Sequence, residues 1–443
     1  MYVKQPEGYV SKTYPSHVLK LTKSLYGLKQ APLEWFKDIS EKLIDYGLVA
    51  SFHDPCLFQN DGIIVVVYVD DVLISTDTKS HAEHFYKHLQ KSYSLKELEE
   101  ANYLLGISIK KLPNGDVQLH QKAYINKMLE DFHMDKAKYS STPVQVGIKY
   151  QKEEGELPKV PYRELVGSLM YLMLSTRPDI AYAVSMLSRF LNCYSNEHWI
   201  AAKQVLRYLA GTQDVALHYS ADSCPSHTIT AFTDTDWGGD VNTRKSTEGY
   251  CIMVNQCTIS WRSALQKSIA LSSAEAEYMG LSQSIKEILW IKGLLQDLKE
   301  DDGAQLLCDN QSAIHIASNP SDGKGRTKHV DIRYHFCKNA IANGEVSVDY
   351  VPTKSNAADI FTKALGKQAF LHLRTLLGIS ALREAIVIPT SHSHTEVLST
   401  ALSTAQKLPL FEDKDLCRSR DHLIGQLTDS ADPSTIKGAK QAN

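Results

Sequence analysis

The sequence predicts a protein of several domains, of mixed α/β and α+β class. Its 443 residues are enough for two or three domains with sizeable cores. Hydrophobic residues make up 43% and charged residues 22%, as in ordinary globular proteins. A β-rich run, a helix-rich block and a part that alternates strands with helices follow one another along the chain. These three patterns require more than one kind of domain.

Changes in composition and periodicity divide the chain into four regions. The first combines a helical stretch at Ala31–Tyr46 with a β-rich run at 63–75, and continues through the turn Pro113-Asn114-Gly115. The second contains the helix-rich block Tyr162–Leu209, and the third is the α/β part. The last is rich in Ser and Thr, and we expect it to be mostly disordered apart from a short helix. The predicted boundaries are 1–150, 151–225, 226–366 and 367–443.

Composition and charge exclude several classes of protein. The formal net charge is only −3, so nucleic-acid binding would have to come from local patches. The eight cysteines form no C-x-x-C pair, which argues against a zinc cage and a disulfide framework. The longest apolar run, Ile63 to Val69, is too short to cross a bilayer, and the N-terminus has no signal-peptide pattern. We therefore expect a soluble intracellular protein without a membrane partner.

A pair of adjacent aspartates, Asp70 and Asp71, interrupts two apolar runs at Ile63–Val69 and Val72–Ile74. The pattern predicts a hairpin with these aspartates at its tip. Neighbouring carboxylates beside an apolar sheet repel each other and lose solvation unless a cation neutralises them, so the pair is a candidate metal site. An ordinary solvated turn is the alternative, and the residues alone leave it open.

The third region predicts the element order β-β-β-α-β-α-β-α. The predicted strands are Thr228–Thr233, Gly249–Val254, Thr258–Arg262, Ser268–Leu271 (one of these runs being an edge or an extension), Gln305–Cys308 and Val346–Tyr350. The predicted helices begin after a cap at Ser273, at Gln311, at Asp331 and at Ala357. This order predicts a central sheet with helices packed against it.

Four acidic residues occupy related positions in this order. Asp234 and Asp309 follow strands, while Glu277 and Asp359 fall in the predicted first turns of helices. Strand ends and helix N-termini meet at one edge of such sheets, so the four are predicted to converge. Their repulsion calls for divalent cations, and oxygen ligands of this kind select Mg²⁺ or Mn²⁺. Taken singly, each acid is also explained as a turn, cap or helix-dipole residue.

Several long motifs, in order, are similar to those of copia-type retrotransposon Pol polyproteins. The first part carries Ser24–Pro32, Asp54–Phe58, Tyr68-Val69-Asp70-Asp71, Tyr103–Ile107, Tyr162–Tyr171 and Thr176–Ile180. The later part carries Thr233–Trp237, Arg244–Tyr250, Ala270–Tyr278, Cys308–Ala313, Arg326–Phe336 and Ala358–Lys363. The resemblance covers roughly residues 1–366.

The resemblance implies a partial reverse-transcriptase palm and thumb, a helical connection and a ribonuclease H-like domain. It assigns the ribonuclease H catalytic and metal-binding set to Asp234, Glu277, Asp309 and Asp359, with Asp236 and Glu275 as lower-ranked neighbours. The implied activity is hydrolysis of the RNA strand of RNA–DNA hybrids with two Mg²⁺ or Mn²⁺ ions. A local basic patch formed by Lys324, Arg326, Lys328 and Arg333 is predicted to contact nucleic acid, although a solvated face explains it equally well.

The resemblance also places the palm aspartates Asp70 and Asp71 beside a third carboxylate on an upstream strand, which this sequence does not contain. We therefore expect the chain alone to lack RNA-directed DNA polymerase activity unless the missing N-terminal part or another Pol chain joins it. A catalytically inactive or domesticated nucleic-acid-binding remnant is the alternative function. The expected location is cytoplasmic, in a virus-like particle, or nuclear.

Overall fold

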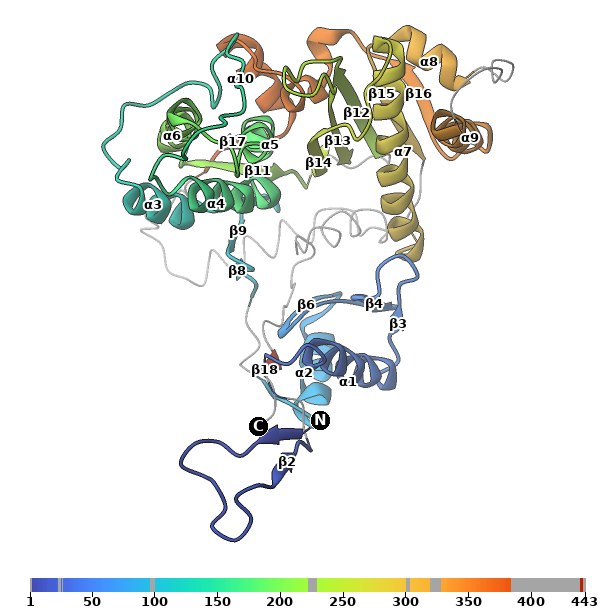
Figure 1. The fold of residues 1–443 in the computed structure, drawn as a ribbon. Coiled ribbons are helices and arrows are strands. Elements are labelled where there is room, and N and C mark those ends of the chain that lie inside the picture. Colours follow the sequence, from blue (N-terminus) through green and yellow to red (C-terminus); the bar gives the residue numbers. More distant parts are fainter. Residues whose placement is uncertain are drawn as a thin grey trace, which may run out of the picture. The chain divides into compact units, whose positions relative to one another are not determined.

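The computed structural model describes residues 2–22, 25, 27–95, 100–221, 229–299, 303–318, 328–383 and 439–440; for 328–334 and 439–440 it describes the backbone only. The chain divides into two compact units (Figure 1). The first unit comprises Met1–Ala101 and Asp432–Asn443, and the second comprises Asn102–Ala431. None of the described helices has both the length and the apolar character needed to cross a membrane.

The first unit is built on a four-stranded antiparallel sheet of order β3-β4-β5-β6. Alternation along β5 buries Ile63, Val65 and Val67 on one face, where α1 and α2 pack through residues such as Leu43 and Phe85. Its elements are β1 (Tyr2–Lys4), β2 (Val18–Lys20), α1 (Ala31–Asp45), β3 (Val49–Ala50), β4 (Leu57–Asn60), β5 (Ile63–Tyr68), β6 (Asp71–Thr76), α2 (Lys79–Gln90), β7 (Ser94–Leu95) and β18 (Ala439–Lys440), which pairs with β7.

The second unit contains a helical part built beside an antiparallel sheet of order β17-β11-β10-β9-β8. The predicted turn at Pro113-Asn114-Gly115 joins β9 to β10, with Gly115 at a φ of 88°. The elements are β8 (Tyr103–Leu104), β9 (Ile107–Lys111), β10 (Val117–His120), α3 (Lys122–Asp131), α4 (Tyr162–Ser175), η1 (Pro178–Ile180), α5 (Ala181–Ser188), α6 (Asn196–Ala210), β11 (Val215–Tyr219), α10 (Lys367–Leu376) and β17 (Ile379–Ala381).

A buried polar network joins three of these helical segments. The Arg177 guanidinium donates to both carboxylate oxygens of Asp179, at 2.9 and 2.8 Å, and both residues are 1% exposed. The Tyr208 hydroxyl of α6 donates to Asp179 and accepts a hydrogen bond from Arg374 of α10 at 3.1 Å. Because a buried ion pair is costly unless its hydrogen bonds are satisfied, these partners hold α6, η1 and α10 in one arrangement.

The compact units of the structure divide the chain at other points than the predicted regions. Strands β8 to β10 share a sheet with β11, so residues 102–150 lie in the same compact unit as the helical block. Residues 367–383 form α10, where a short helix was expected in an otherwise disordered tail, and also the unexpected strand β17. Phe370, Leu373 and Ile379 are buried, and β17 pairs with β11. Apart from residues 439–440, the rest of the predicted tail lies outside the described residues.

The α/β part of the second unit is a five-stranded sheet of order β14-β13-β12-β15-β16. Strand β12 pairs antiparallel with β13 and parallel with β15, which in turn pairs parallel with β16. The elements are β12 (Ile229–Asp236), β13 (Thr247–Val254), β14 (Cys257–Leu265), α7 (Ser273–Asp297), β15 (Ala304–Cys308), α8 (Gln311–Ser318), α9 (Lys328–Ala342), β16 (Ser347–Tyr350), η2 (Thr353–Ser355) and η3 (Ala357–Phe361).

Helix α7 supplies much of the core of this part. Its apolar residues Leu281, Ile285 and Ile288, at spacings of three and four, are fully buried against Ala231 of β12 and Leu306 of β15. Figure 1 shows α7 alongside these strands. The predicted mixed α/β fold class is therefore confirmed. The observed order differs from the predicted β-β-β-α-β-α-β-α, because two helices, α8 and α9, lie between β15 and β16 and the part ends in the 3₁₀ segments η2 and η3.

Local details of the prediction need correction. Ser268–Leu271 is not a strand. The cap of α7 is Ser272, whose extended backbone lets its hydroxyl accept from the Glu275 backbone N–H at 3.2 Å. Helix α9 begins at Lys328 rather than Asp331, and the last predicted helix, Ala357–Leu365, is the short 3₁₀ segment η3.

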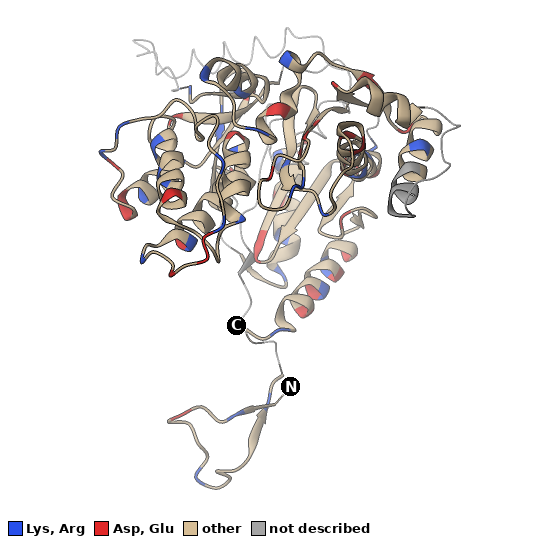
Figure 2. Cartoon of the chain, turned by 45° about the horizontal axis from the view of Figure 1, so that its top comes forward, with Lys and Arg blue, Asp and Glu red and all other residues tan. Residues whose placement is uncertain are grey.

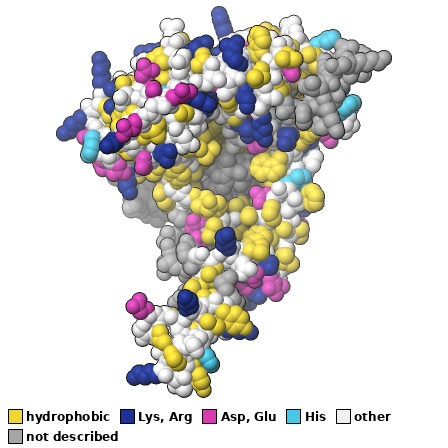
Figure 3. Space-filling view, in the orientation of Figure 1, with side chains coloured by type: hydrophobic (Ala, Val, Ile, Leu, Met, Phe, Trp, Pro, Cys, Tyr) yellow, Lys and Arg dark blue, Asp and Glu magenta, His cyan; other side chains and the backbone are white. Residues whose placement is uncertain are grey.

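The helical part and the α/β part of the second unit are joined by direct polar contacts. The Trp261 indole of β14 donates to the Met173 carbonyl of α4 at 2.8 Å, and the Tyr219 hydroxyl of β11 donates to the Thr258 carbonyl at 2.9 Å. Arg189, at the end of α5, lies 3.6 Å from Asp240. Figure 2 shows acidic and basic residues interspersed over these elements, and Figure 3 shows the same mixture on one face, in line with the net charge of −3.

Candidate active site

Two aspartates are brought together by the register of two parallel strands. The β12–β15 ladder ends with Thr233 opposite Cys308, so Asp234 is the next residue of β12 and Asp309 directly follows β15. Asp234 is 3% exposed, whereas Asp309 is half-buried. Carboxylate oxygens of Asp234, Asp309 and Asp359 all lie within 4.8 Å of one another. The sheet edge thus gathers three of the four predicted carboxylates into one group.

The fourth carboxylate, Glu277, reaches this group from α7. The helix approaches β12 closely at Gly280, where an added Cβ would lie 2.7 Å from the Thr235 hydroxyl oxygen. Glu277, one turn earlier, is 6% exposed and has an oxygen within 4.8 Å of one from Asp309. Because the cap is Ser272, Glu277 lies in the second turn and not in the predicted first turn. Because glycine has no Cβ, Gly280 permits α7 to lie this close to β12.

Asp359 is positioned by a buried asparagine and by a second close approach. The Asn356 side chain donates to the Thr233 carbonyl of β12 at 2.9 Å, and its oxygen accepts from the Ala358 N–H at 3.1 Å. On the other side, a Cβ at Gly249 of β13 would lie 2.5 Å from the Cβ of Phe361. Segment η3 is thereby held against β12 and β13, with Asp359 directed to Asp234.

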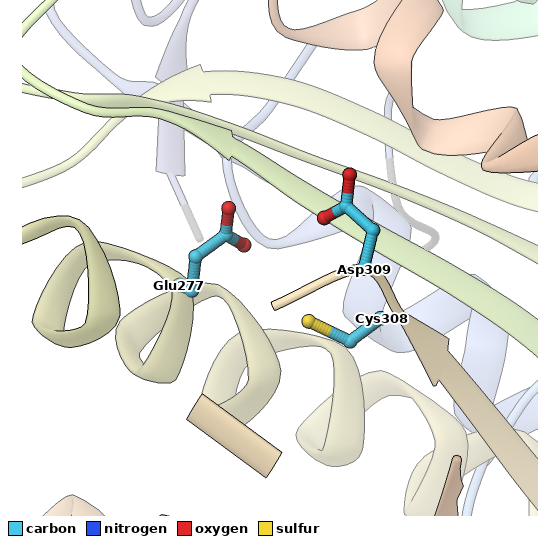
Figure 4. Close-up of side chains that lie close together, drawn as sticks. All are labelled: Glu277, Cys308 and Asp309. Atoms are coloured by element: carbon cyan, nitrogen blue, oxygen red, sulfur yellow. The ribbon is translucent and has the colours of Figure 1, made fainter. Parts of the chain in front are cut away.

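Cys308 lies next to Asp309 and also has an atom within 4.8 Å of Glu277 and Asp309. Figure 4 shows the Glu277 and Asp309 carboxylates on either side of a common space, with the Cys308 thiol beside it. Burial raises the pKa of this thiol, and Glu277 adds to the effect, so the sulfur stays protonated. A hard cation prefers carboxylate oxygens to a neutral thiol, and we do not count Cys308 as a ligand.

Three residues that the sequence reasoning did not single out contact these carboxylates. The Lys363 ammonium lies 2.9 Å from Asp359 and 3.5 Å from Asp234. The Thr362 hydroxyl donates to Asp234, and the Thr353 hydroxyl donates to Asp309 at 2.7 Å. For Lys363 the spacing of four residues from Asp359 was an available signal, since such pairs meet on helical segments. The threonines carry no comparable sequence signal.

Burial and repulsion from neighbouring carboxylates raise the pKa values of Glu277 and Asp359. Burial raises the pKa of Glu277 to about 9, with further contributions from Asp234 and Asp309. Burial, and then Asp234, raise the pKa of Asp359 to about 7. One carboxylate oxygen of Glu277 is buried without a hydrogen-bond partner within the described part of the chain. Such an arrangement is typical of a site that stabilises its carboxylates by binding a cation.

Three of the carboxylates, those of Asp234, Glu277 and Asp309, line a pocket of about 530 Å³. Its other lining residues come from β12, from the start of α8, from the end of β16 and from the segment after η3: Thr235, Asn310, Gln311, Ser312, Tyr350 and Lys363. Tyr350 is 51% exposed at the rim. The pocket is wide and open, so a large ligand can approach the carboxylates.

The lower-ranked acids have other roles in the structure. Glu275 accepts a hydrogen bond from the Leu271 backbone N–H at 2.8 Å and helps to cap α7. Asp236 ends β12, and burial raises its pKa, with Asp234 adding to the effect. Among the described residues, neither belongs to a group of three or more candidate metal ligands.

The hairpin aspartates lie in a different environment. Tyr68 pairs with Asp71, so the turn residues are Val69 and Asp70 rather than the predicted Asp70 and Asp71. Val69 has a φ of 52°, and its carbonyl accepts from the Trp35 indole. Asp70 is exposed and Asp71 half-buried. Of the candidate metal-ligand groups in the described chain, none includes either aspartate.

The predicted basic patch is only partly described. Lys324 and Arg326 lie outside the described residues. Lys328 and Arg333 fall on α9, but only their backbone is described. Their contact with nucleic acid stays a prediction.

The chain is similar to proteins of transposons, and its first part matches a known family. A family model described as reverse transcriptase (RNA-dependent DNA polymerase) matches residues 1–146. Pol polyproteins of two plant transposons are each 38% identical over 86% of this chain: that of TNT 1-94 from Nicotiana tabacum and that of RE1 from Arabidopsis thaliana. A transposon Ty5-1 protein of Saccharomyces cerevisiae is 34% identical over 65% of this chain and 95% of its own length.

Similarity to solved structures is weaker. A foamy viral protease-reverse transcriptase bound to double-stranded DNA is 13% identical, covers 73% of this chain and 49% of its own, and has a TM-score of 0.40. The N-terminal ribonuclease H domain of a Mycobacterium tuberculosis protein is 15% identical, covers 34% of this chain and 98% of its own, and has a TM-score of 0.24. The fold assignment rests on the sheet order given above.

The chain belongs to the class of mobile-element Pol polyproteins, and its residues 1–146 match the reverse transcriptase family. More narrowly, it belongs to the copia-type retrovirus-related Pol polyproteins of transposons. It spans 29% and 26% of the length of the two plant Pol polyproteins.

Proposed function

We propose that the second unit hydrolyses the RNA strand of RNA–DNA hybrids with the help of divalent cations. The observation that carries this proposal is the convergence of Asp234, Asp309 and Asp359 within 4.8 Å, with Glu277 joined to Asp309 on the other side. Four carboxylates converge here, and Lys363 supplies a single positive charge beside two of them, so most of their repulsion is left uncompensated. A cation site compensates it.

The residues present fit a pair of hard divalent ions. All four donors are carboxylates, and the unpartnered oxygen of Glu277 is a ligand atom without a protein partner in the described chain. Bound Mg²⁺ or Mn²⁺ would supply an activated water and would stabilise the leaving oxygen during in-line attack on a phosphodiester. The protein's own contribution is orientation: Thr353 fixes Asp309, Thr362 fixes Asp234, and Asn356 fixes the segment that carries Asp359.

The open pocket supports a large polyanionic substrate. Asn310, Gln311 and Ser312 at the start of α8 line it and offer polar groups for contacts to a sugar-phosphate backbone. Recognition of the RNA strand would require contacts to 2′-hydroxyl groups across the minor groove. We place this activity inside the cell, in a cytoplasmic virus-like particle or in the nucleus, as for a mobile-element protein.

The test is cleavage of a labelled RNA paired with DNA, followed on a gel with Mg²⁺ and with EDTA. Wild type is expected to cut the RNA only in the hybrid and only with metal, and Asp309→Asn is expected not to cut. Binding of the hybrid by wild type without cleavage would favour the inactive nucleic-acid-binding protein instead. Absence of both would contradict the proposal entirely.

We further propose that residues 1–443 do not extend a DNA primer by themselves. Asp70 and Asp71 have no third carboxylate close enough to complete a metal site among the described residues. Phosphoryl transfer with two metal ions needs ligands that hold both. Primer extension on an RNA template, with Asp70→Asn as the comparison, tests this; incorporation by wild type alone would contradict it. Another part of Pol, or another Pol chain, is the proposed partner for polymerisation.

A further inference from the structure

One cationic side chain lies inside the carboxylate cluster. The Lys363 ammonium is 2.9 Å from an Asp359 oxygen and 3.5 Å from an Asp234 oxygen. Its side chain is 38% exposed and lines the same pocket as Asp234, Glu277 and Asp309. Among the described residues that line this pocket, Lys363 is the only one with a positive charge. The ammonium therefore contacts two of the carboxylates that would bind a metal ion, those of Asp234 and Asp359.

The packing of the preceding segment, η3, determines the position of Lys363. Asn356 and the close contact at Gly249 hold η3 against the sheet, and Lys363 follows η3 by two residues. The neighbouring Thr362 is fully buried, and its hydroxyl donates to Asp234. The packing of the backbone thus places Lys363 at the cluster, and its partly exposed side chain can also turn into the open pocket.

We infer that Lys363 is an internal counter-ion, which neutralises part of the cluster before metal binds and which a divalent ion must displace. This inference rests on the metal site of the proposed function. A single positive charge next to two ligand carboxylates repels an arriving divalent ion and competes for the same oxygens. Lys363 thereby sets the metal concentration at which the site fills, and it stabilises the metal-free protein. Once displaced, its ammonium is free to contact a phosphate at the pocket.

The test measures Mn²⁺ binding by calorimetry on the full chain without nucleic acid. Lys363→Met is expected to bind Mn²⁺ about tenfold more tightly than wild type, because it lacks the competing charge. Lys363→Arg, which keeps the charge, is expected to stay close to wild type. Lys367→Met is the matched control, since Lys367 is exposed at the start of α10 and is not among the residues lining the pocket. It makes the same change in net charge and is expected to leave Mn²⁺ binding unchanged.

If Lys363→Met is too unstable for calorimetry, thermal melting is a second measurement. Lys363→Gln is a second variant that also lacks the charge. Both variants are expected to melt below wild type in EDTA and to gain more from saturating Mn²⁺ than wild type does. Equal or weaker Mn²⁺ binding by both variants would overturn the counter-ion role and leave the nuclease proposal intact. Failure of wild type, Lys363→Met and Lys363→Gln alike to bind Mn²⁺ would overturn the metal site and this inference together.

Discussion

The chain contains two acidic constellations, and the fold surrounds them differently. Asp70 and Asp71 lie at the tip of a two-stranded hairpin, exposed or half-buried, with one strand pair as their support. Asp234, Glu277, Asp309 and Asp359 come from four separate elements, and three of them are less than 9% exposed. Close approaches at Gly249 and Gly280 bring those elements together. The comparison shows that an acidic sequence motif alone does not make a metal site. The carboxylates must also be brought together, and this depends on how separate elements pack.

The largest predicted effect separates the two constellations by activity. Glu277→Gln is expected to lower cleavage of an RNA–DNA hybrid by more than about 100-fold, because losing even a partner of a metal ligand typically costs roughly 10- to 100-fold. Asp70→Asn, which makes the corresponding change at the exposed hairpin, is expected to cut as fast as wild type. Initial rates with Mg²⁺ measure both. A slow Asp70→Asn enzyme would mean that the two constellations act together.

The next effect is on stability as a function of pH in the metal-free protein. The pKa of Glu277 rises from 4.5 to about 9 on folding, and that of Asp359 rises from 3.8 to about 7. Each group binds its proton more tightly in the folded protein. The stabilisation from Asp359 is therefore fully present below pH 3.8 and is lost as the pH rises through about 7, and that from Glu277 is fully present below pH 4.5 and is lost as the pH rises through about 9. Urea unfolding in EDTA should show stability falling across this range, and saturating Mn²⁺ should reduce the fall. Glu277→Gln should flatten the upper part of the curve; an unchanged slope would contradict this account.

A third prediction tests the packing that distinguishes the cluster from the hairpin. Gly280→Ala is expected to destabilise the protein by about 1–3 kcal/mol, because the new methyl group would lie against Thr235 and push α7 from β12. Gly167→Ala is the matched control, since Gly167 is also helical but its Cβ would meet nothing within 4 Å. That substitution is expected to stabilise α4 by about 0.5–1 kcal/mol. Chemical denaturation measures both; equal effects would show that the close approach is unimportant.

The smallest predicted effect concerns the orientation of one ligand. Thr353→Val removes the hydroxyl that donates to Asp309 at 2.7 Å and is expected to slow hybrid cleavage roughly 3- to 10-fold. Ser355→Ala, at an exposed position of the same 3₁₀ turn, should leave the rate unchanged, and Thr353→Ser should restore most of it. If Thr353→Val cuts at the wild-type rate, the hydrogen bond does not orient Asp309.

The sequence predicted the sheet of the α/β part because alternation and helical spacing are local patterns. The apolar series Leu281, Ile285 and Ile288 identified α7, and the strands before Asp234 and Asp309 placed those residues at one sheet edge. The structure does bring the four predicted carboxylates together, while their catalytic role stays a prediction. The hairpin was also predicted, but with its turn displaced by one residue.

Contacts between distant segments were not predictable in the same way. Lys363 and Thr362 meet the cluster because η3 packs against β13 at Gly249, which no local pattern specifies. Thr353 reaches Asp309 from η2, the turn that follows β16. The return of residues 367–383 to β11 was missed for the same reason. A helix of ten residues and a strand of three give weak periodicity, and their stability comes from Phe370, Leu373 and the pairing with β11.

The pairing of β17 with β11 also bears on the order of folding during synthesis. Val215 of β11 pairs with Ala381, and all five strands of the α/β sheet lie between these two residues in the chain. The ribosome therefore completes the whole α/β part before the edge strand of the neighbouring sheet exists. Contacts of such long sequence separation form slowly. Until β17 is made, β11 is an unpaired edge strand of its sheet, while the α/β part is already able to fold. The α/β part is thus synthesised between β11 and β17, the two strands whose pairing completes the neighbouring sheet.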